Sequence, residues 1–317
     1  MKSRTWYLSE TGFPCNSYCV PGNEMTESQK TEALHILNQA RNLIGNRFGG
    51  YRVEVQIPET GERIVARGHR VQTDGAIYHV LREIPQIIPE LSLPELAYEP
   101  WLYRVLLDPN WVYGGMVLIA GSAGSGKSTT MAATMVSRLK TFGGLGITIE
   151  DPPEYSIQGQ HNRGVCMQFP AADQSDFPDL MLDALRCYPA GLHGSILLVG
   201  EIRSPEVASL VVESALGGHL VLTTIHAMSP ESALSRLCTL AGQINGVETA
   251  RADVAESLRA VIYQRMMNGR PQMQALVNES NSGAIPAKIR DGQFHQLNAD
   301  IMRQKVLLQQ GRSPTWL

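Results

Sequence analysis

Long hydrophobic runs are absent from this sequence. No apolar stretch in its 317 residues approaches the roughly 18 residues that a membrane-spanning helix needs. The first twenty residues, MKSRTWYLSETGFPCNSYCV, also lack the continuous apolar core of a signal peptide. We therefore expect a cytoplasmic protein whose contact with any membrane is peripheral.

Cysteine and net charge are scarce as well. The five cysteines are odd in number and scattered along the chain, a pattern that favours free thiols. Cys15 and Cys19 are spaced C-x3-C, but no second pair follows to complete a zinc site. The net charge of −3 gives no overall attraction to nucleic acid or anionic lipid, so we expect no direct binding of nucleic acid.

The first third of the chain has the pattern of a small α+β domain. Residues 1–25 show no clear period and are expected to form an N-terminal extension. Residues 26–48 have apolar positions at helical spacing, with Thr26 and Gln29 as a capping box. The next segments, 51–57, RIVARGHRV and AIYHVLREI, alternate as strands. With a helix expected over 94–107, we predict a domain spanning 26–107.

Residues 108–317 alternate between buried strands and helices. The apolar runs are 116–121, 144–151, 195–201 and 219–226, and helical stretches lie near 127–141, 176–187, 205–216 and 230–241. This order predicts an α/β fold with a mostly parallel sheet that is covered on both faces. Ligands of such sheets bind beyond the carboxyl ends of the strands. Lys127, Glu150, Glu201 and His226 should therefore gather at one edge.

A phosphate-binding loop opens this second domain. GSAGSGKS, from Gly121 to Ser128, matches G-x-x-x-x-G-K-[ST] between a predicted strand and a predicted helix. We expect Lys127 to contact the β- and γ-phosphates of ATP and the Ser128 hydroxyl to reach Mg²⁺. The predicted nucleotide-binding residues are Gly121, Ser122, Ala123, Gly124, Ser125, Gly126, Lys127, Ser128 and Thr129.

Four further side chains are candidates for catalysis. Glu150 ends the strand in TIEDPPEY and is expected to reach the Mg²⁺ or its water shell. Glu201 follows Gly200 in SILLVGE and is expected to orient the attacking water, with a surface pair to Arg203 as the alternative. In GGHLVLTTIHA, His226 ends the strand and is the expected sensor of the γ-phosphate. His219 precedes that strand, and for it catalytic and structural roles remain equally open.

In their order and spacing, GSAGSGKSTT, TIEDPPEY, ILLVGEIR and GGHLVLTTIHA resemble the Walker A, Asp box, Walker B and His box of the secretion or traffic ATPases. That family drives type II secretion, type IV pilus extension and retraction, and type IV secretion. The segment 256–267, ESLRAVIYQRMM, looks like the helix that follows its His box. The resemblance implies a RecA-like core, a PAS-like N-terminal domain, a homo-hexameric ring and inner-membrane components of a secretion or pilus machine as partners.

The resemblance also implies arginines that reach ATP from the N-terminal domain or from a neighbouring subunit. Arg63 and Arg70 lie among the arginines of the predicted sheet, although a solvated surface role is favoured for both. The candidate arginine fingers are Arg67 and Arg82 in the small domain, and Arg186, Arg203 and Arg236 in the core.

Some features depart from the family's pattern. RCYPAGLHGS stands where R-x-D-P-D is common, Ser204 stands where Asp is usual, and the segment after Arg265 is short and polar, unlike the helical tail of pilus retraction motors. No four-cysteine insertion is present. These departures favour a type IV secretion or conjugation ATPase, including the type IVB (Dot/Icm-like) branch. The alternatives are a pilus retraction ATPase, a P-loop kinase of a small molecule, a non-hydrolysing nucleotide switch and a DNA-translocating ring.

Overall fold

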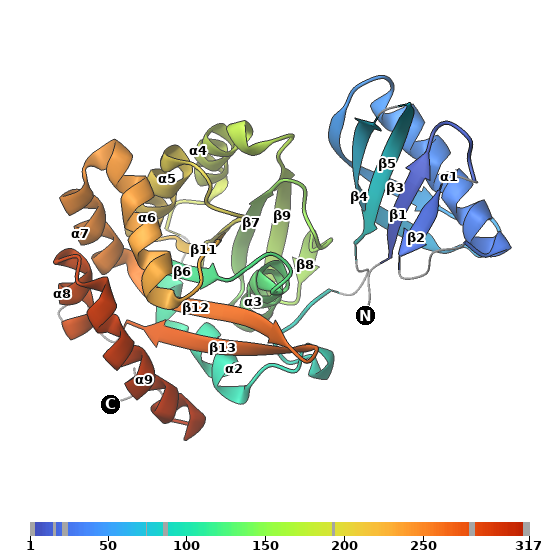
Figure 1. The fold of residues 1–317 in the computed structure, drawn as a ribbon. Coiled ribbons are helices and arrows are strands. Elements are labelled where there is room, and N and C mark those ends of the chain that lie inside the picture. The colour runs from blue at the N-terminus through green and yellow to red at the C-terminus, as the bar shows by residue number, and fades with distance from the viewer. Residues whose placement is uncertain are drawn as a thin grey trace. The chain divides into compact units, whose positions relative to one another are not determined.

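The computed structural model describes residues 4–14, 17–20, 25–73, 75–84, 88–191, 194–278 and 283–312. Two compact units make up the chain (Figure 1). The first comprises Met1–Ile87 with Glu154–Ser156, and the second comprises Ile88–Pro153 with Ile157–Leu317. Among the described residues, no helix combines the length and the apolar character that crossing a membrane requires.

The N-terminal unit is an antiparallel sheet with one helix packed on it. Its elements are β1 (Thr5–Ser9), β2 (Tyr18–Val20), α1 (Glu27–Ile44), β3 (Gly49–Gln56), β4 (Arg63–Thr73) and β5 (Ala76–Glu83). The strand order is β2-β1-β5-β4-β3. The predicted capping box of α1 is present. The Thr26 hydroxyl accepts from the backbone N–H of Gln29, and the Gln29 side-chain oxygen accepts from the backbone N–H of Thr26. The predicted helix and three strands are confirmed.

Residues 1–25 are not the simple extension that the sequence suggested. Strands β1 and β2 within this stretch belong to the sheet, and Trp6 and Leu8 are fully buried in its core. The Trp6 indole Nε1 also donates to the Glu83 carboxylate at 2.8 Å. Strands of five and three residues are too short to show a clear hydrophobic period in the sequence. Residues 1–3, 15–16 and 21–24 lie outside the described part.

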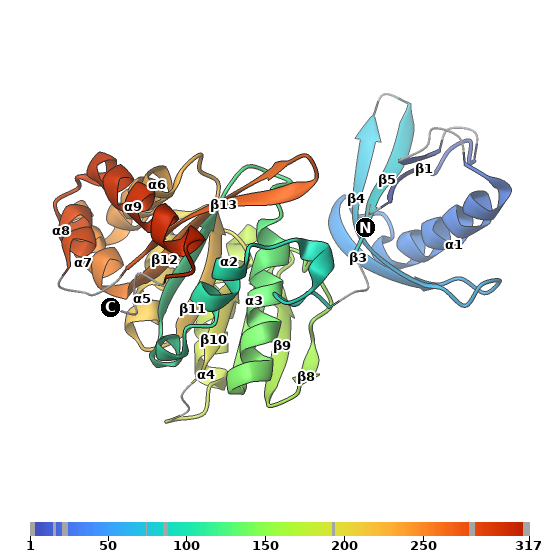
Figure 2. The same cartoon turned by 90° about the horizontal axis from the view of Figure 1, so that it is seen from below.

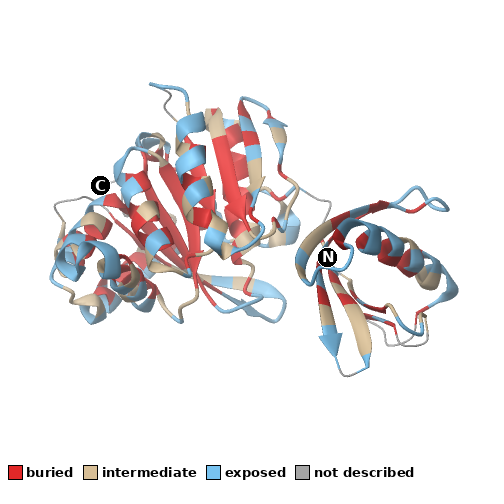
Figure 3. Cartoon of the chain, turned by 90° about the horizontal axis from the view of Figure 1, so that it is seen from above, coloured by how far each residue is buried: buried red, intermediate tan, exposed pale blue. Residues whose placement is uncertain are grey.

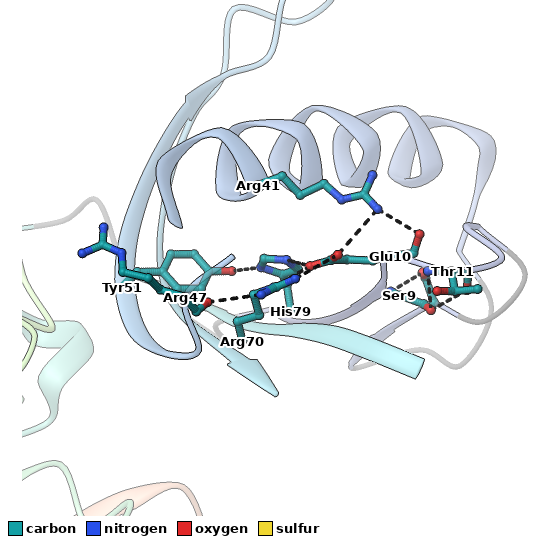
Figure 4. Close-up of polar contacts among 9 residues, drawn as sticks. Ser9, Glu10, Thr11, Arg41, Arg47, Tyr51, Arg70 and His79 are labelled. Carbon is teal, nitrogen blue, oxygen red and sulfur yellow. Dashed lines mark hydrogen bonds and ion pairs between the residues drawn. The ribbon is translucent and has the colours of Figure 1, made fainter. Parts of the chain in front are cut away.

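A buried polar network holds this unit together (Figure 4). The ring of His79, fully buried, lies between the Glu10 carboxylate (Nε2 to Oε1, 2.7 Å) and the Tyr51 hydroxyl (2.5 Å from Nδ1). Arg70 donates to the same carboxylate at 2.7 Å. Burial lowers the pKa of His79, and the hydrogen bond from Arg70 lowers the pKa of Glu10. Arg70 is only 6% exposed and is therefore a structural residue here.

The second unit is built on an eight-stranded sheet in the order β13-β12-β6-β11-β10-β7-β9-β8. The pairs from β12 to β9 are parallel, and β13 and β8 are antiparallel edges. The strands are β6 (Gly115–Ala120), β7 (Gly144–Glu150), β8 (Gly159–His161), β9 (Gly164–Pro170), β10 (Ile196–Val199), β11 (Leu220–Ile225), β12 (Leu258–Met267) and β13 (Arg270–Val277).

Helices cover both faces of this sheet. The helices of this unit are α2 (Pro100–Leu106), α3 (Lys127–Phe142), α4 (Phe177–Cys187), α5 (Pro205–Leu216), α6 (Pro230–Asn245), α7 (Val247–Ser257), α8 (Ala284–Arg290) and α9 (Leu297–Gln309). Met135 of α3 presses on Gly146 of β7, whereas Ile149 of the same strand packs with Phe177 of α4 on the other face. Figures 2 and 3 show α3 lying over the sheet and the central strands buried. The predicted α/β fold with a mostly parallel sheet is confirmed.

The segment 256–267 is mostly a strand, not the predicted helix. Within β12, Val261 pairs with Leu118 of β6 on one side and with Leu276 of β13 on the other. The run of β-branched and aromatic residues Val261, Ile262 and Tyr263 suits this doubly paired position. The prediction of a short polar segment after Arg265 is also wrong, because β13, α8 and α9 follow it.

The helix expected over 94–107 is shorter than predicted and belongs to the second unit. A 3-10 turn covers Pro94–Leu96, and α2 begins at Pro100, a residue suited to the first helical position. Arg138 of α3, 1% exposed, donates to the carbonyl oxygens of Leu106 at 2.8 Å and Asp108 at 3.1 Å. The change between units therefore falls near residue 88 and not at 107–108.

Candidate functional site

The phosphate-binding loop joins β6 to α3 at the carboxyl edge of the sheet. Gly124 and Gly126 have φ angles of 74° and 88°, which glycine adopts without strain. The Lys127 ammonium folds inward and donates to the carbonyl oxygens of Gly121 at 3.0 Å and Ser122 at 2.9 Å. The positive charge thus lies inside the ring of the loop, where a phosphate would be received.

Other groups of the loop also fit a phosphate. The Ser125 hydroxyl is buried and has no hydrogen-bond partner among the described residues, an arrangement that a folded protein rarely tolerates without a ligand or water. Ser128 and Thr129 lie half-buried in the first turn of α3. A helix N-terminus presents backbone N–H groups and the positive end of the helix dipole, and both favour an anion.

Two neighbouring strands bring Glu150 beside the loop that follows β10. Val199 pairs with Ile149, and the backbone N–H of Gly200 donates to the Ile149 carbonyl at 2.9 Å. A Cβ on Gly200 would meet the Cγ of Glu150 at 3.5 Å, so the Glu150 side chain lies against this glycine. Glu150 is 9% exposed. A carboxylate from β7 thus lies directly beside the residue that precedes Glu201.

Glu201 and His226 are in direct contact at the same edge. The Nε2 atom of His226 lies 2.9 Å from Oε1 of Glu201, and its Nδ1 atom lies 3.1 Å from the Gly121 carbonyl oxygen. Arg203 approaches the other carboxylate oxygen, Oε2, to 2.6 Å. The expected convergence of the carboxylate and the imidazole on the loop is therefore found within one unit of the chain. The surface pair between Glu201 and Arg203, the alternative, forms as well.

The match to known proteins agrees with this geometry. The pattern of the family described as "Type II/IV secretion system protein" matches residues 50–299. This chain belongs to that family. A relative from Klebsiella pneumoniae, "Type II secretion system protein E", is 35% identical over 229 residues, which are 70% of this chain and 39% of that protein. The chain thus spans less than two thirds of the length of the first curated relatives it matches.

Two solved structures share the fold of this secretion family member. The Legionella pneumophila ATPase DotB superposes with a TM-score of 0.68 at 22% identity, covering 98% of this chain and 88% of that one. The pilus retraction motor PilT with bound ADP superposes with a TM-score of 0.70 at 23% identity, covering 96% of this chain and 87% of that one. At these identities the likeness shows the fold alone.

His219 lies away from the loop. It precedes β11 at the edge where the strands begin, and the six residues of β11, at about 3.3 Å each, separate it from His226. Its Nδ1 atom is 2.9 Å from the Ser195 hydroxyl, and its ring lies 4.7 Å from that of Tyr188. Burial lowers the pKa of His219. The structure thus favours the structural alternative for this residue.

The core arginines have different surroundings. Arg203 contacts Glu201, as described above, and 55% of its side chain is exposed. Arg236 of α6 donates to the backbone oxygen of His226 at 3.2 Å. Arg186 is an exposed residue of α4 whose guanidinium pairs with Asp183 at 3.0 Å, on the same helix. The structure brings Arg203 and Arg236 to the candidate site within this unit, and Arg186 has a local partner instead.

In the N-terminal unit, three arginines form a row across the sheet. Arg67 of β4 pairs directly with Arg52 of β3 on one side and with Arg82 of β5 on the other. Arg67 and Arg82 are exposed, and Arg52 is half-buried. Arg52 was not among the predicted residues, although the strand alternation could have placed it on the same face. Arg63 is exposed too, but Glu54 holds its guanidinium at 2.6 Å.

Proposed function

We propose that this chain is a Mg²⁺-dependent ATPase that converts ATP and water to ADP and phosphate. As a homo-hexamer it would be the motor of a type IV secretion or conjugative pilus system, in the cytoplasm and peripheral to the inner membrane. The observation that carries the ATPase proposal is the convergence of Lys127, Glu150 and the Glu201–His226 pair at one edge of the sheet.

Each group has a chemical task in this proposal. Lys127 and the backbone N–H groups of the loop bind the β- and γ-phosphate oxygens. Ser128 and Glu150 would hold Mg²⁺, which when bound neutralises charge on those oxygens. Glu201 orients the attacking water through its carboxylate. Its Oε2 atom accepts from both Nε and Nη2 of Arg203, whereas Oε1 has one contact, to His226, and keeps a lone pair that can accept a hydrogen bond from water.

His226 is the proposed sensor of the terminal phosphate. Its ring joins the water-orienting carboxylate to the first carbonyl of the loop. A phosphate that displaces the Lys127 ammonium from the Gly121 carbonyl would remove one of the two donors to that oxygen. The carbonyl could then accept a stronger hydrogen bond from the imidazole. The occupancy of the loop is thereby transmitted to Glu201 and along β11.

A motor also needs nucleotide binding to favour one conformation over another. We propose that ATP binding favours closure of the N-terminal unit on the core, with Arg67, Arg82 or an arginine of a neighbouring subunit completing the site. The names of the similar structures support the binding of nucleotide, because DotB is called an ATPase and PilT was solved with ADP. Inner-membrane components of the machine are the proposed partners.

Pilus retraction is the second candidate. A short polar tail would count against it, but β13, α8 and α9 follow Arg265. The similarity of fold extends to the retraction motor PilT. Neighbouring genes for pilins or for a secretion channel would distinguish the two systems.

The decisive experiment is phosphate release by the purified full chain with ATP and Mg²⁺ and no added acceptor. An ATPase releases phosphate, and a Lys127→Ala variant should lose both nucleotide binding and release. A small-molecule kinase would bind ATP and release little phosphate without its acceptor. A nucleotide switch would bind ATP without turnover. Either of these two results would contradict the proposal.

A further inference from the structure

Gln264 of β12 contacts the phosphate-binding loop through its side chain. Its side chain is 1% exposed. The amide Nε2 donates to the carbonyl oxygen of Ser125 at 2.6 Å, and the amide Oε1 accepts from the Thr130 hydroxyl at 2.7 Å. One buried amide therefore holds the loop just before Lys127 and the first turn of α3 just after it.

The backbone of β12 is equally close to the loop. A Cβ on Gly126 would lie 2.7 Å from Nε2 of Gln264, and a Cβ on Gly121 would lie 2.3 Å from its backbone oxygen. Both distances are too short for real side chains, so glycine at the first and last turn of the loop is what permits contact with Gln264. The loop thus rests against this single residue at both of its ends.

The hydrogen bonds run in one direction. The Thr130 hydroxyl has a single hydrogen, which it gives to Gln264 at 2.7 Å, because its other acceptor, the Gly126 carbonyl, is farther away at 3.3 Å. The Tyr98 hydroxyl, 2.7 Å from the Thr130 oxygen, must then be the donor to it. The chain of donors leads from Tyr98 through Thr130 and Gln264 to the Ser125 carbonyl. The Ser125 carbonyl can only accept, so the amide must face the loop with its nitrogen.

We infer that Gln264 is a positioning residue that keeps the loop in its phosphate-binding conformation. The inference rests on the proposed binding of ATP at Lys127 and adds a residue that touches neither phosphate nor metal. Without the amide, the Ser125 carbonyl loses its donor in a buried place, and the loop must shift to find another. That shift moves the backbone N–H groups that bind phosphate, so it should weaken binding of ATP more than it slows turnover at saturation.

The chain offers a matched control. Gln304 of α9 is also fully buried, and its amide makes two hydrogen bonds, accepting from the Val277 N–H at 2.7 Å and donating to the Val277 carbonyl at 2.8 Å. It joins α9 to the end of β13 at Val277, which pairs with Ala260, whereas Gln264 pairs with Met273. Gln264→Met and Gln304→Met remove comparable buried hydrogen bonds, so both should lower the melting temperature.

The test is the dissociation constant of ATP, measured by calorimetry on the full chain, together with KM and kcat. Gln264→Met should raise the dissociation constant and KM about tenfold, the usual scale for one lost buried hydrogen bond, with a smaller change in kcat. Gln304→Met should leave both constants within about twofold of wild type. Thr130→Val should act in the same direction as Gln264→Met, and Thr130→Ser, which keeps the hydroxyl, should restore binding.

Wild-type affinity in both Gln264→Met and Thr130→Val would overturn the inference, as would an equal loss in Gln304→Met. If Gln264→Met does not fold, the two Thr130 variants decide the question alone. A wild-type chain that binds ATP but releases no phosphate would contradict the proposed ATPase and leave this comparison intact. A wild-type chain that binds no ATP would overturn both.

Discussion

The ring of His226 lies between the Glu201 carboxylate, 2.9 Å from Nε2, and the Gly121 carbonyl, 3.1 Å from Nδ1. Both neighbours are acceptors, whereas a neutral imidazole carries one N–H. The ring can therefore donate to both only when it is protonated at both nitrogens. Proton position at His226 and water orientation at Glu201 are thus linked through one hydrogen bond.

Replacing Glu201 by Gln should separate binding from turnover. The amide keeps the shape of the side chain but removes the charge that orients and accepts a proton from water, so we expect kcat to fall about 10²-fold or more. The dissociation constant of ATP should change little, because Lys127 and the loop are intact. Glu256→Gln, on the exposed side of α7, is the control. Normal phosphate release by Glu201→Gln would show that another group activates the water.

Arg203 can be assigned by a double-mutant cycle with Glu201. Its guanidinium lies 2.6 Å from Oε2 of Glu201, so Arg203→Gln should lower kcat roughly tenfold by freeing the carboxylate. If Arg203 acts through Glu201, the same change in a Glu201→Gln background should have almost no further effect. Turnover of the four proteins measures this. If the losses of kcat in the two single variants multiply in the double variant, Arg203 acts independently of Glu201. That result would favour a direct role of Arg203 at the phosphate of another subunit.

The arginine row of the N-terminal unit gives a third prediction. If Arg67 or Arg82 acts as a finger, Arg67→Gln or Arg82→Gln should lower turnover at least tenfold, since full fingers contribute about 10³–10⁵. Arg63→Gln is the matched control, because Arg63 is exposed on the same strand but engaged by Glu54. We expect it to stay within about twofold of wild type. Equal rates for all three variants would exclude a role for the row in catalysis.

His219 gives a negative prediction. Its contacts to Ser195 and Tyr188 lie at the edge where the strands begin, so His219→Asn should lower the melting temperature and leave kcat within about twofold. Phosphate release at saturating ATP measures this. A loss of turnover as large as that of Glu201→Gln would mean that His219 reaches a site supplied by another subunit.

Much of the candidate site could be predicted because its chemistry is local or follows from strand polarity. Gly121 to Ser128 have fixed spacing, and the parallel order alone brings Glu150, Glu201 and His226 to one edge. The length of β11 could also have shown that His219 and His226 lie at opposite edges of the sheet, since a six-residue strand spans about 20 Å. Strands β1 and β2 could not be predicted in this way, because five and three residues are too few to show an alternating pattern.

Other features depend on partners that are distant in sequence. The segment 258–267 is a strand because β6 and β13 lie on either side of it, and a window of ten residues contains no sign of those neighbours. Gln264 escaped notice for the same reason. Its importance comes from Ser125 and Thr130, which are more than 130 residues away in the chain.

The buried network of the N-terminal unit predicts a dependence of stability on pH. Burial places the pKa of His79 below its unfolded value of 6.5, so the unfolded chain takes up the proton first as the pH falls. Stability should be complete above about pH 6.5 and decline below it. The hydrogen bond from Arg70 lowers the pKa of Glu10 from 4.5, so its contribution is present above pH 4.5 and is lost as the pH falls further.

The first decline should disappear in His79→Gln, whose amide can still face Tyr51 and Glu10 but does not titrate, and it should persist in His69→Gln, an exposed histidine of β4. The measurement is thermal unfolding between pH 7.5 and 5 (about five steps), with hydrogen exchange of the β5 amides to assign the change to this unit. A wild-type melting temperature that is constant over this range would contradict the account of His79. So would an equal flattening in His69→Gln, because it would place the titrating group on the surface.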